Sequence, residues 1–93
     1  MSSEDVLLPA GHPIGTPSQG GDETIRNVAG GPERAREIYE QLAKDGAPYR
    51  GDYPGGGVEL EDGGFVGIRG EHTATPTIDV NIPTVPEVRK LHF

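Results

Sequence analysis

Apolar side chains recur every three or four positions in one segment of this 93-residue chain, as they do along the buried stripe of a helix. The stripe consists of Ala35, Ile38, Tyr39, Leu42 and Ala43. Pro32 is favourable in a first helical turn, and Gly46 is a favourable stop. The spacing therefore predicts an amphipathic helix over residues 32–45, with its stripe in the core.

Beyond this helix, apolar and polar residues alternate in four short segments, which is typical of strands with one buried face. The segments are residues 57–61, 64–70, 77–82 and 87–93. Asp62, Gly63 and Gly64 form a turn signal, which predicts a hairpin between the first two segments. We therefore predict an α+β domain in which the helix packs on a three- to four-stranded antiparallel sheet.

The alternation also predicts which side chains face away from the helix. Thr77 and Asp79 alternate with apolar positions in their segment, and Lys90 and His92 do so near the C-terminus. Arg69 ends an earlier segment on the side opposite its apolar residues. Because successive side chains of a strand point to opposite faces, these five residues are expected to share the outer face of the sheet.

The N-terminal part of the chain carries few groups to bury. Residues 1–22 are rich in Ser, Gly, Pro and acids, so we predict a flexible lead-in without which residues 23–93 fold as the domain. The first ten residues have acids where a signal peptide has Lys or Arg, and no apolar run approaches the 18 residues of a membrane span. The sequence thus predicts no signal peptide and no membrane partner.

Composition limits the size of the core and the kind of site. Leu, Ile, Val and Phe total 20 residues, whereas Gly and Pro total 24, so a thin core and no multidomain enzyme are expected. The absence of Cys excludes disulfide and zinc–thiolate scaffolds. The net charge of −7 lies in residues 1–62, which hold 12 acids and 5 bases, whereas residues 63–93 hold 3 of each. This balance argues against an extended nucleic-acid surface, but less so for the last third of the chain.

The last third contains the groups that RNA cleavage without a metal needs: a proton acceptor, a proton donor, and cations or hydrogen-bond donors for the phosphorane. The candidate catalytic residues are Arg69, His72, Thr75, Thr77, Asp79, Lys90 and His92. The imidazoles would move protons, the cations would hold phosphate, the hydroxyls would donate to its oxygens, and Asp79 would orient a neighbour. The alternative interpretation is a polar loop beside the solvated face of a sheet.

Other residues are candidates for binding. Tyr49, Arg50 and Tyr53 combine aromatic rings with a cation, which suits stacking on nucleotides, although the rings could equally close the end of the core. The candidate RNA-binding residues are Tyr49, Arg50 and Arg89. Glu71 and His72 together with Asp79 offer oxygen and nitrogen ligands for a metal, but their spacing matches no metal motif, so we predict no metal site and no cofactor.

Three runs of the sequence resemble the C-terminal toxin domains of bacterial polymorphic toxins, which are effectors of the contact-dependent inhibition and RHS types. The runs are NVAGGPERAREIYEQLAKDG, GGGVELEDGGFVGIRG and PTIDVNIPTVPEVRKLHF. Such domains are similar to the barnase, EndoU, colicin and RelE-like ribonucleases, which have N-terminal helices and a four-stranded antiparallel sheet. In these toxins an Arg at a strand end precedes a Ser/Thr-rich stretch and a strand beginning Thr-Ile-Asp, a pattern that Arg69, Thr75, Thr77 and Asp79 match.

The resemblance implies a toxin that acts as a metal-independent endoribonuclease, often on tRNA, and leaves a 2′,3′-cyclic phosphate. It also implies a cognate immunity protein and secretion or delivery into the cytoplasm of a target cell, and we expect a monomer. Glu71 and His72 depart from the pattern, which has small hydroxyl residues there. The alternatives from other classes are a non-catalytic acidic interaction or adaptor domain and a structural piece of a phage or secretion apparatus.

Overall fold

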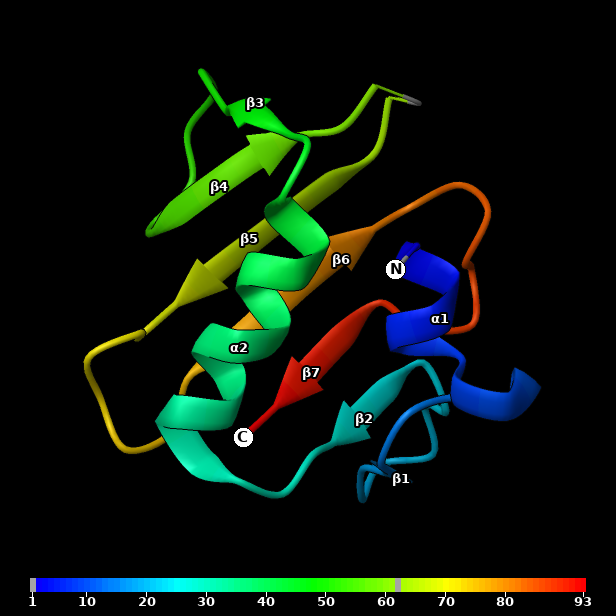
Figure 1. The fold of residues 1–93 in the computed structure, drawn as a ribbon. Coiled ribbons are helices and arrows are strands. Elements are labelled where there is room, and N and C mark those ends of the chain that lie inside the picture. Colours follow the sequence, from blue (N-terminus) through cyan, green and yellow to red (C-terminus); the bar gives the residue numbers. More distant parts are fainter. Residues whose placement is uncertain (1, 62) are drawn as a thin grey trace.

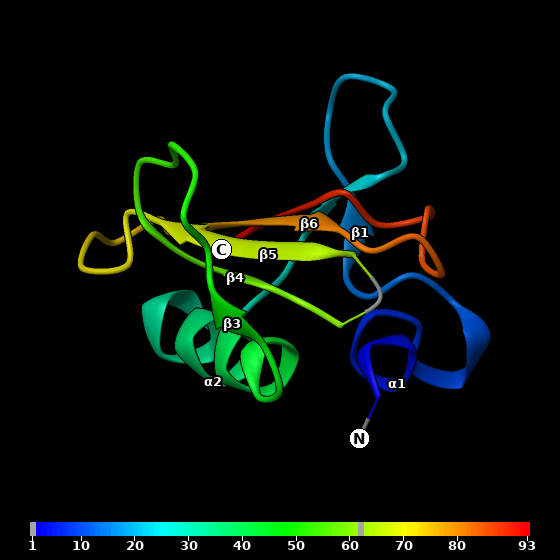
Figure 2. The ribbon, with the colours of Figure 1, turned by 90° about the horizontal axis from the view of Figure 1, so that it is seen from above.

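A seven-stranded, mostly antiparallel sheet carries two helices on one of its faces (Figures 1 and 2). The computed structural model describes residues 2–61 and 63–93. The elements in chain order are α1 (Ser3–Leu7), the 3₁₀ turn η1 (Pro9–Gly11), β1 (Thr16–Pro17), β2 (Ile25–Asn27), α2 (Gly31–Ala43), β3 (Ala47–Pro48), β4 (Gly56–Glu59), β5 (Phe65–Arg69), β6 (Thr77–Asn81) and β7 (Lys90–His92). The strands are ordered β1-β2-β7-β6-β5-β4-β3 across the sheet.

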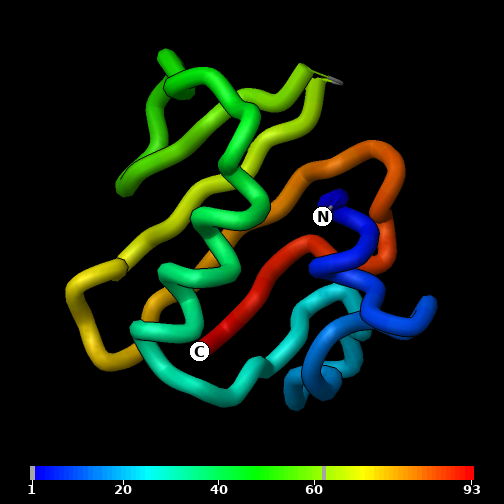
Figure 3. The backbone as a smooth tube through the Cα atoms, viewed as in Figure 1, coloured from blue at the N-terminus to red at the C-terminus, as the bar shows by residue number. Residues whose placement is uncertain are grey.

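Strands β4 to β7 form an antiparallel meander, and β2 extends it by pairing parallel to β7. The two-residue strands β1 and β3 form the two edges. Pro17 and Pro48 lie in these edge strands, where proline is tolerated because one side of the strand needs no ladder bonds. The early strand β2 thus lies beside the last strand of the chain, and β1 lies on the other side of β2 (Figure 3).

The α+β class predicted from the sequence is confirmed, but the prediction of three to four strands is wrong. The four predicted segments correspond to β4, β5, β6 and β7, and β1, β2 and β3 add to them. The added strands have two or three residues, too few to show alternation. In β2, moreover, Arg26 rather than an apolar residue lies opposite the buried Leu91. Asp62 of the predicted turn lies outside the described residues.

Helix α2 covers the sheet at β5 and β6 and spans Gly31–Ala43, where the sequence predicts residues 32–45. Gly30 precedes it with a φ of 113°, a left-handed conformation that suits glycine, and Pro32 follows in the first turn. The stripe residues Ala35, Ile38 and Leu42 are buried. In the described part of the chain, no helix has both the length and the apolar character to cross a membrane.

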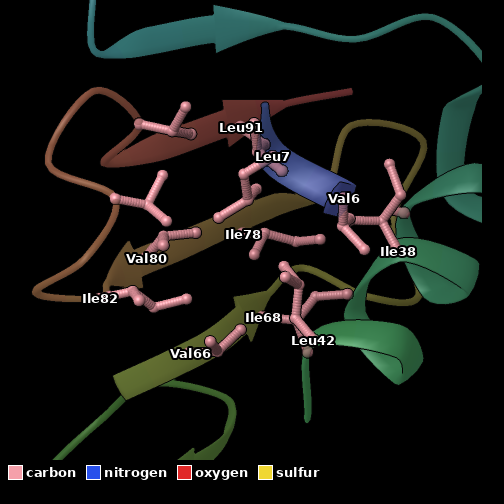
Figure 4. Close-up of a cluster of buried hydrophobic side chains, with 13 residues drawn as sticks. Val6, Leu7, Ile38, Leu42, Val66, Ile68, Ile78, Val80, Ile82 and Leu91 are labelled. Atoms are coloured by element: carbon pink, nitrogen blue, oxygen red, sulfur yellow. The ribbon is translucent and has the colours of Figure 1, made fainter. Parts of the chain in front are cut away.

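The core lies between the sheet and the helices (Figure 4). Its buried hydrophobic residues are Val6, Leu7, Ala35, Ile38, Leu42, Val66, Ile68, Ile78, Val80, Ile82, Val85, Val88 and Leu91. In β6 these alternate with Thr77, Asp79 and Asn81, and in β5 with Phe65, Gly67 and Arg69. The pleat therefore separates an apolar inner face from an outer face that is polar at β6 and mixed at β5.

Helix α1 packs in this core, although the sequence predicts that residues 1–22 form a flexible lead-in. Val6 is 7% exposed and Leu7 is 0% exposed. Ser2 caps the helix through a reciprocal hydrogen-bond pair with Asp5, which satisfies two of the free N–H groups at its start. Two buried residues in a five-residue helix leave no periodic pattern, so the sequence did not indicate this packing.

The buried Arg26 joins β2 to the segment that leads into β1. Its guanidinium donates to the backbone carbonyls of Ile14 at 2.9 Å, Gly15 at 3.1 Å and Glu23 at 3.1 Å. A buried cation is tolerated when its N–H groups are satisfied in this way. The N-terminal segment is therefore tied to the sheet by hydrogen bonds as well as by apolar packing.

Candidate active site

A row of five polar side chains crosses the outer face of the sheet, the face without helices. The register places Thr16 opposite Asn27, Asn27 opposite His92, His92 opposite Thr77, and Thr77 opposite Arg69. We call these five residues the polar row. Within it, Nδ1 of His92 lies 3.3 Å from Oγ1 of Thr77, which is hydrogen-bonding distance. An imidazole, a hydroxyl and a guanidinium thus occupy neighbouring positions on three adjacent strands.

Asp79 and Lys90 form a charged pair beside the polar row, opposite each other in β6 and β7. Arg69 donates two hydrogen bonds to Asp79. One runs from Nε to Oδ2 at 2.6 Å, and the other from Nη2 to Oδ1 at 3.3 Å. Nζ of Lys90 lies 3.9 Å from Oδ1 of the same carboxylate. One carboxylate therefore holds two cations at the outer face.

Tyr53 also contacts Asp79. It lies in the loop of residues 49–55, which precedes β4. Its hydroxyl donates a hydrogen bond of 2.7 Å to Oδ2 of Asp79. Its ring lies over Gly67, the residue opposite Asp79 in β5, where a Cβ atom would come within 2.5 Å of the ring. Glycine at this strand position therefore makes room for the ring. Sequence reasoning missed this contact, because no periodic pattern relates a loop residue to a strand residue 26 positions away.

These contacts set the protonation states of two groups. Burial alone would raise the pKa of Asp79, but hydrogen bonds from Arg69 and Tyr53, and the positive charges of Arg69 and Lys90, hold that pKa below its ordinary value. Burial first, and then the hydrogen bond to the carboxylate, raise the pKa of the Tyr53 hydroxyl. Near neutral pH, Asp79 is therefore an anion and Tyr53 a neutral donor. His92 supplies the polar row with an imidazole, the side chain that most often transfers protons in enzymes.

Two loops stand above the sheet on either side of this face, residues 18–24 and residues 49–55 (Figure 2). A pocket at the first loop is lined by Asp22, Thr24, Ile25, Asp79, Val80, Arg89 and Lys90. A second pocket is lined by Gly15, Thr16, Asn27, Val28, Ala29, His92 and Phe93. The outward residues of β7, Lys90 and His92, thus each line one pocket, so a ligand lying along β7 would contact both.

Five of the seven candidate catalytic residues lie together: Arg69, Thr77, Asp79, Lys90 and His92. The register agrees with the alternation that led us to expect them on one face. His72 and Thr75 are not joined to the polar row, because they lie exposed on the connection between β5 and β6. That connection contacts α2, where Nη1 of Arg36 donates to the carbonyl of Glu71 at 3.5 Å.

The candidate RNA-binding residues border the site. Tyr49 packs edge-on against Phe65, with 4.7 Å between ring centroids, and remains 36% exposed. Arg50 is exposed on the same loop. Arg89 is exposed and lines the pocket that also contains Lys90. An aromatic ring and a cation therefore border the outer face at residues 49–55, and another cation borders it at the pocket beside residues 18–24.

The sequence also missed Asn27 and Thr16 as members of the polar row, because neither lies in a segment with a strand pattern. Among residues 2–61 and 63–93, no group of three or more His, Cys, Asp or Glu side chains is arranged to hold a metal ion. The side chains present offer hydrogen-bond donors, cations, one carboxylate and one imidazole, which suit binding and proton transfer at an anionic group.

Comparison with known proteins assigns no family to the chain. No family model, no curated protein and no solved structure matches it.

Proposed function

We propose that this chain is an antibacterial toxin that acts as a metal-independent endoribonuclease, with its active site on the outer face of the sheet. The observation that carries the proposal is the polar row, in which His92, Thr77 and Arg69 lie side by side next to Lys90. The resemblance of three sequence runs to polymorphic toxin domains supports the same function. His72 and Thr75 stand outside the proposed catalytic set.

The proposed reaction transfers the phosphoryl group from the 5′-oxygen of one nucleotide to the 2′-oxygen of its neighbour. His92 takes the proton of the 2′-hydroxyl, the 2′-oxygen bonds to phosphorus, and the bond from phosphorus to the 5′-oxygen breaks. The leaving oxygen takes a proton from solvent. The products are a 2′,3′-cyclic phosphate and a 5′-hydroxyl.

The remaining groups stabilise charge and set geometry. Arg69 and Lys90 bind the phosphate, whose negative charge grows in the transition state. Thr77 lies between the imidazole and the guanidinium, so its hydroxyl orients His92 in the free protein and donates to a phosphate oxygen in the complex. Asp79 orients Arg69 and takes no proton, in keeping with its lowered pKa.

The substrate that we propose is RNA, in particular tRNA, with Tyr49 and Arg50 positioned to contact a base and its phosphate. Any base can stack on an exposed aromatic ring, so such a contact imposes little sequence preference. A cognate immunity protein and delivery into the cytoplasm of a target cell belong to the same proposal, as does a monomeric state.

The test is cleavage of tRNA and total RNA by the 93-residue chain in the presence of EDTA, with analysis of the termini that form. We expect a cyclic phosphate at the 3′ end, and we expect His92→Ala and Arg69→Ala to lower the cleavage rate by roughly 10²–10³. His72→Ala is the matched control and should keep the wild-type rate. Melting temperatures should show that all three variants are folded.

The proposal would be wrong if no RNA were cut, or if the two histidine variants lost activity equally. Rescue of an EDTA-inhibited reaction by a divalent ion would also contradict it, because the 2′-hydroxyl mechanism needs no metal. If the chain is folded but cuts no RNA, the alternative function of a non-catalytic acidic interaction domain would be favoured. The net charge of −7 is consistent with that alternative.

A further inference from the structure

The loop of residues 49–55 is held on the outer sheet face by aromatic packing. Phe65 makes edge-on contacts with Tyr49 and Tyr53, with ring centroids 4.7 and 5.1 Å apart. A Cβ atom on Gly67 would lie 2.5 Å from the ring of Tyr53 and 2.8 Å from that of Phe65. The loop therefore packs on the sheet over Gly67, which has no side chain. In this position the Tyr53 hydroxyl donates to the carboxylate of Asp79.

Some hydrogen-bond donors of Arg69 bind Asp79, and the others can bind a phosphate. A guanidinium has five N–H groups. Asp79 accepts two hydrogen bonds from Arg69, which leaves other N–H groups of the guanidinium for a phosphate. Tyr53 donates to the same oxygen, Oδ2, that accepts from Nε of Arg69. Without the hydroxyl, the carboxylate would depend on its two cations alone for its orientation, and Arg69 would turn with it.

We propose that Tyr53 is a positioning residue of the active site, which fixes the carboxylate of Asp79 so that Arg69 presents its remaining N–H groups to a phosphate. The inference rests on the proposed function, since it assigns a role within the same site. It extends that function to a loop residue that never contacts the reacting atoms.

Tyr53→Phe tests the inference, because it removes the hydroxyl and keeps the ring on Gly67. Three measurements apply: carboxyl-carbon NMR titration of Asp79, the Kd for inorganic phosphate, and kcat and KM for RNA cleavage. We expect the pKa of Asp79 to rise because a donor to its charged form is lost. We expect the Kd to increase several-fold, and kcat to fall about tenfold or more with a smaller change in KM, because the loss is one of geometry.

Two further variants separate positioning from packing. Tyr39→Phe, on the helical side of the sheet, is the matched control and should leave all three measurements unchanged. Gly67→Ala should displace the ring and repeat the effect of Tyr53→Phe on Asp79. Combining the two site variants should then add little to that effect, because both remove the same contact.

The possible results separate this inference from the proposed function. An unchanged Asp79 titration and phosphate Kd in Tyr53→Phe would overturn the role of Tyr53, whatever the chain does to RNA. A changed titration and a weaker phosphate Kd would support the role of Tyr53, even if the wild-type chain cuts no RNA. In that case the ribonuclease proposal fails, and the phosphate site remains.

Discussion

Asp79 accepts hydrogen bonds from Arg69 and Tyr53 and lies 3.9 Å from the ammonium of Lys90. Its side chain is 23% exposed, so these interactions are partly screened by water and their contribution to stability is modest. The arrangement nevertheless keeps the carboxylate charged. At the scale of single residues, the outer face therefore holds the Asp79 carboxylate between the cations of Arg69 and Lys90.

The lowered pKa of Asp79 predicts how stability depends on pH. A carboxyl whose pKa is lower in the folded than in the unfolded state stabilises the fold above its unfolded value of about 3.9. That stabilisation is lost as the pH falls through the folded-state pKa. Asp79→Asn should therefore lower stability near neutral pH and reduce the loss of stability on acidification, as measured by urea unfolding from pH 7 to pH 2.

Asp52→Asn provides the control, since Asp52 is exposed on the loop that carries Tyr53. It should change the stability near neutral pH by less than about 0.5 kcal/mol, as expected for an exposed position. A profile for Asp79→Asn that parallels the wild-type profile would show that the carboxylate gains nothing from its partners on folding.

At the scale of elements, α1 is short but lies against the core. A five-residue helix has no stability of its own, so its capping box and its packing against α2 must hold it. Val6 and Leu7 supply that packing. Their burial argues against the expectation that residues 23–93 fold equally well without the preceding segment.

Removing the buried contacts of α1 should therefore destabilise the whole domain. Leu7→Ala deletes a fully buried side chain, and such substitutions cost about 2–5 kcal/mol. Deletion of residues 1–22 should lower the melting temperature markedly as well. Chemical denaturation of both variants provides the measurement.

Glu4→Ala, an exposed position in the same helix, is the control and should change stability by less than about 0.5 kcal/mol. If Leu7→Ala behaved like this control, α1 would be dispensable, and the boundary at residue 23 would hold.

At the scale of the whole molecule, the chain is acidic and the cations available to a phosphate are few. The outer face has Arg69 and Lys90 at the proposed site, with Arg50 and Arg89 at its borders. The overall charge of −7 opposes the approach of RNA. Affinity for the proposed RNA substrate would then come from a small number of local contacts and from stacking.

This charge distribution predicts a shallow salt dependence of RNA binding. Each phosphate contact on a single strand contributes about −0.7 to the slope of log K against log salt, so two to four contacts give roughly −1.5 to −3. Filter binding of the His92→Ala variant, in which cleavage is expected to be slow, provides the measurement. Adding Lys90→Ala to it should make the slope shallower by about 0.7. A slope of −6 or steeper would reveal a basic surface that this face does not contain.

The sequence by itself determined the elements whose residues repeat with a clear period. The stripe of Ala35, Ile38 and Leu42 indicated α2, because a helix buries every third or fourth residue. Alternation indicated β5 and β6 and placed Arg69, opposite the buried residues, on the outer face. These inferences needed only local geometry, because the direction of a side chain along a regular element follows from the backbone.

Only the tertiary structure decided the contacts between segments without such periodicity. The parallel pairing of β2 with β7 brings Asn27 beside His92, and the loop before β4 brings Tyr53 onto Gly67 and Asp79. In both cases the partners lie far apart in the chain, on elements too short or too irregular to carry a pattern. Their meeting depends on how the packed core places whole segments, so the number of strands and the position of Tyr53 could not be predicted from the order of residues.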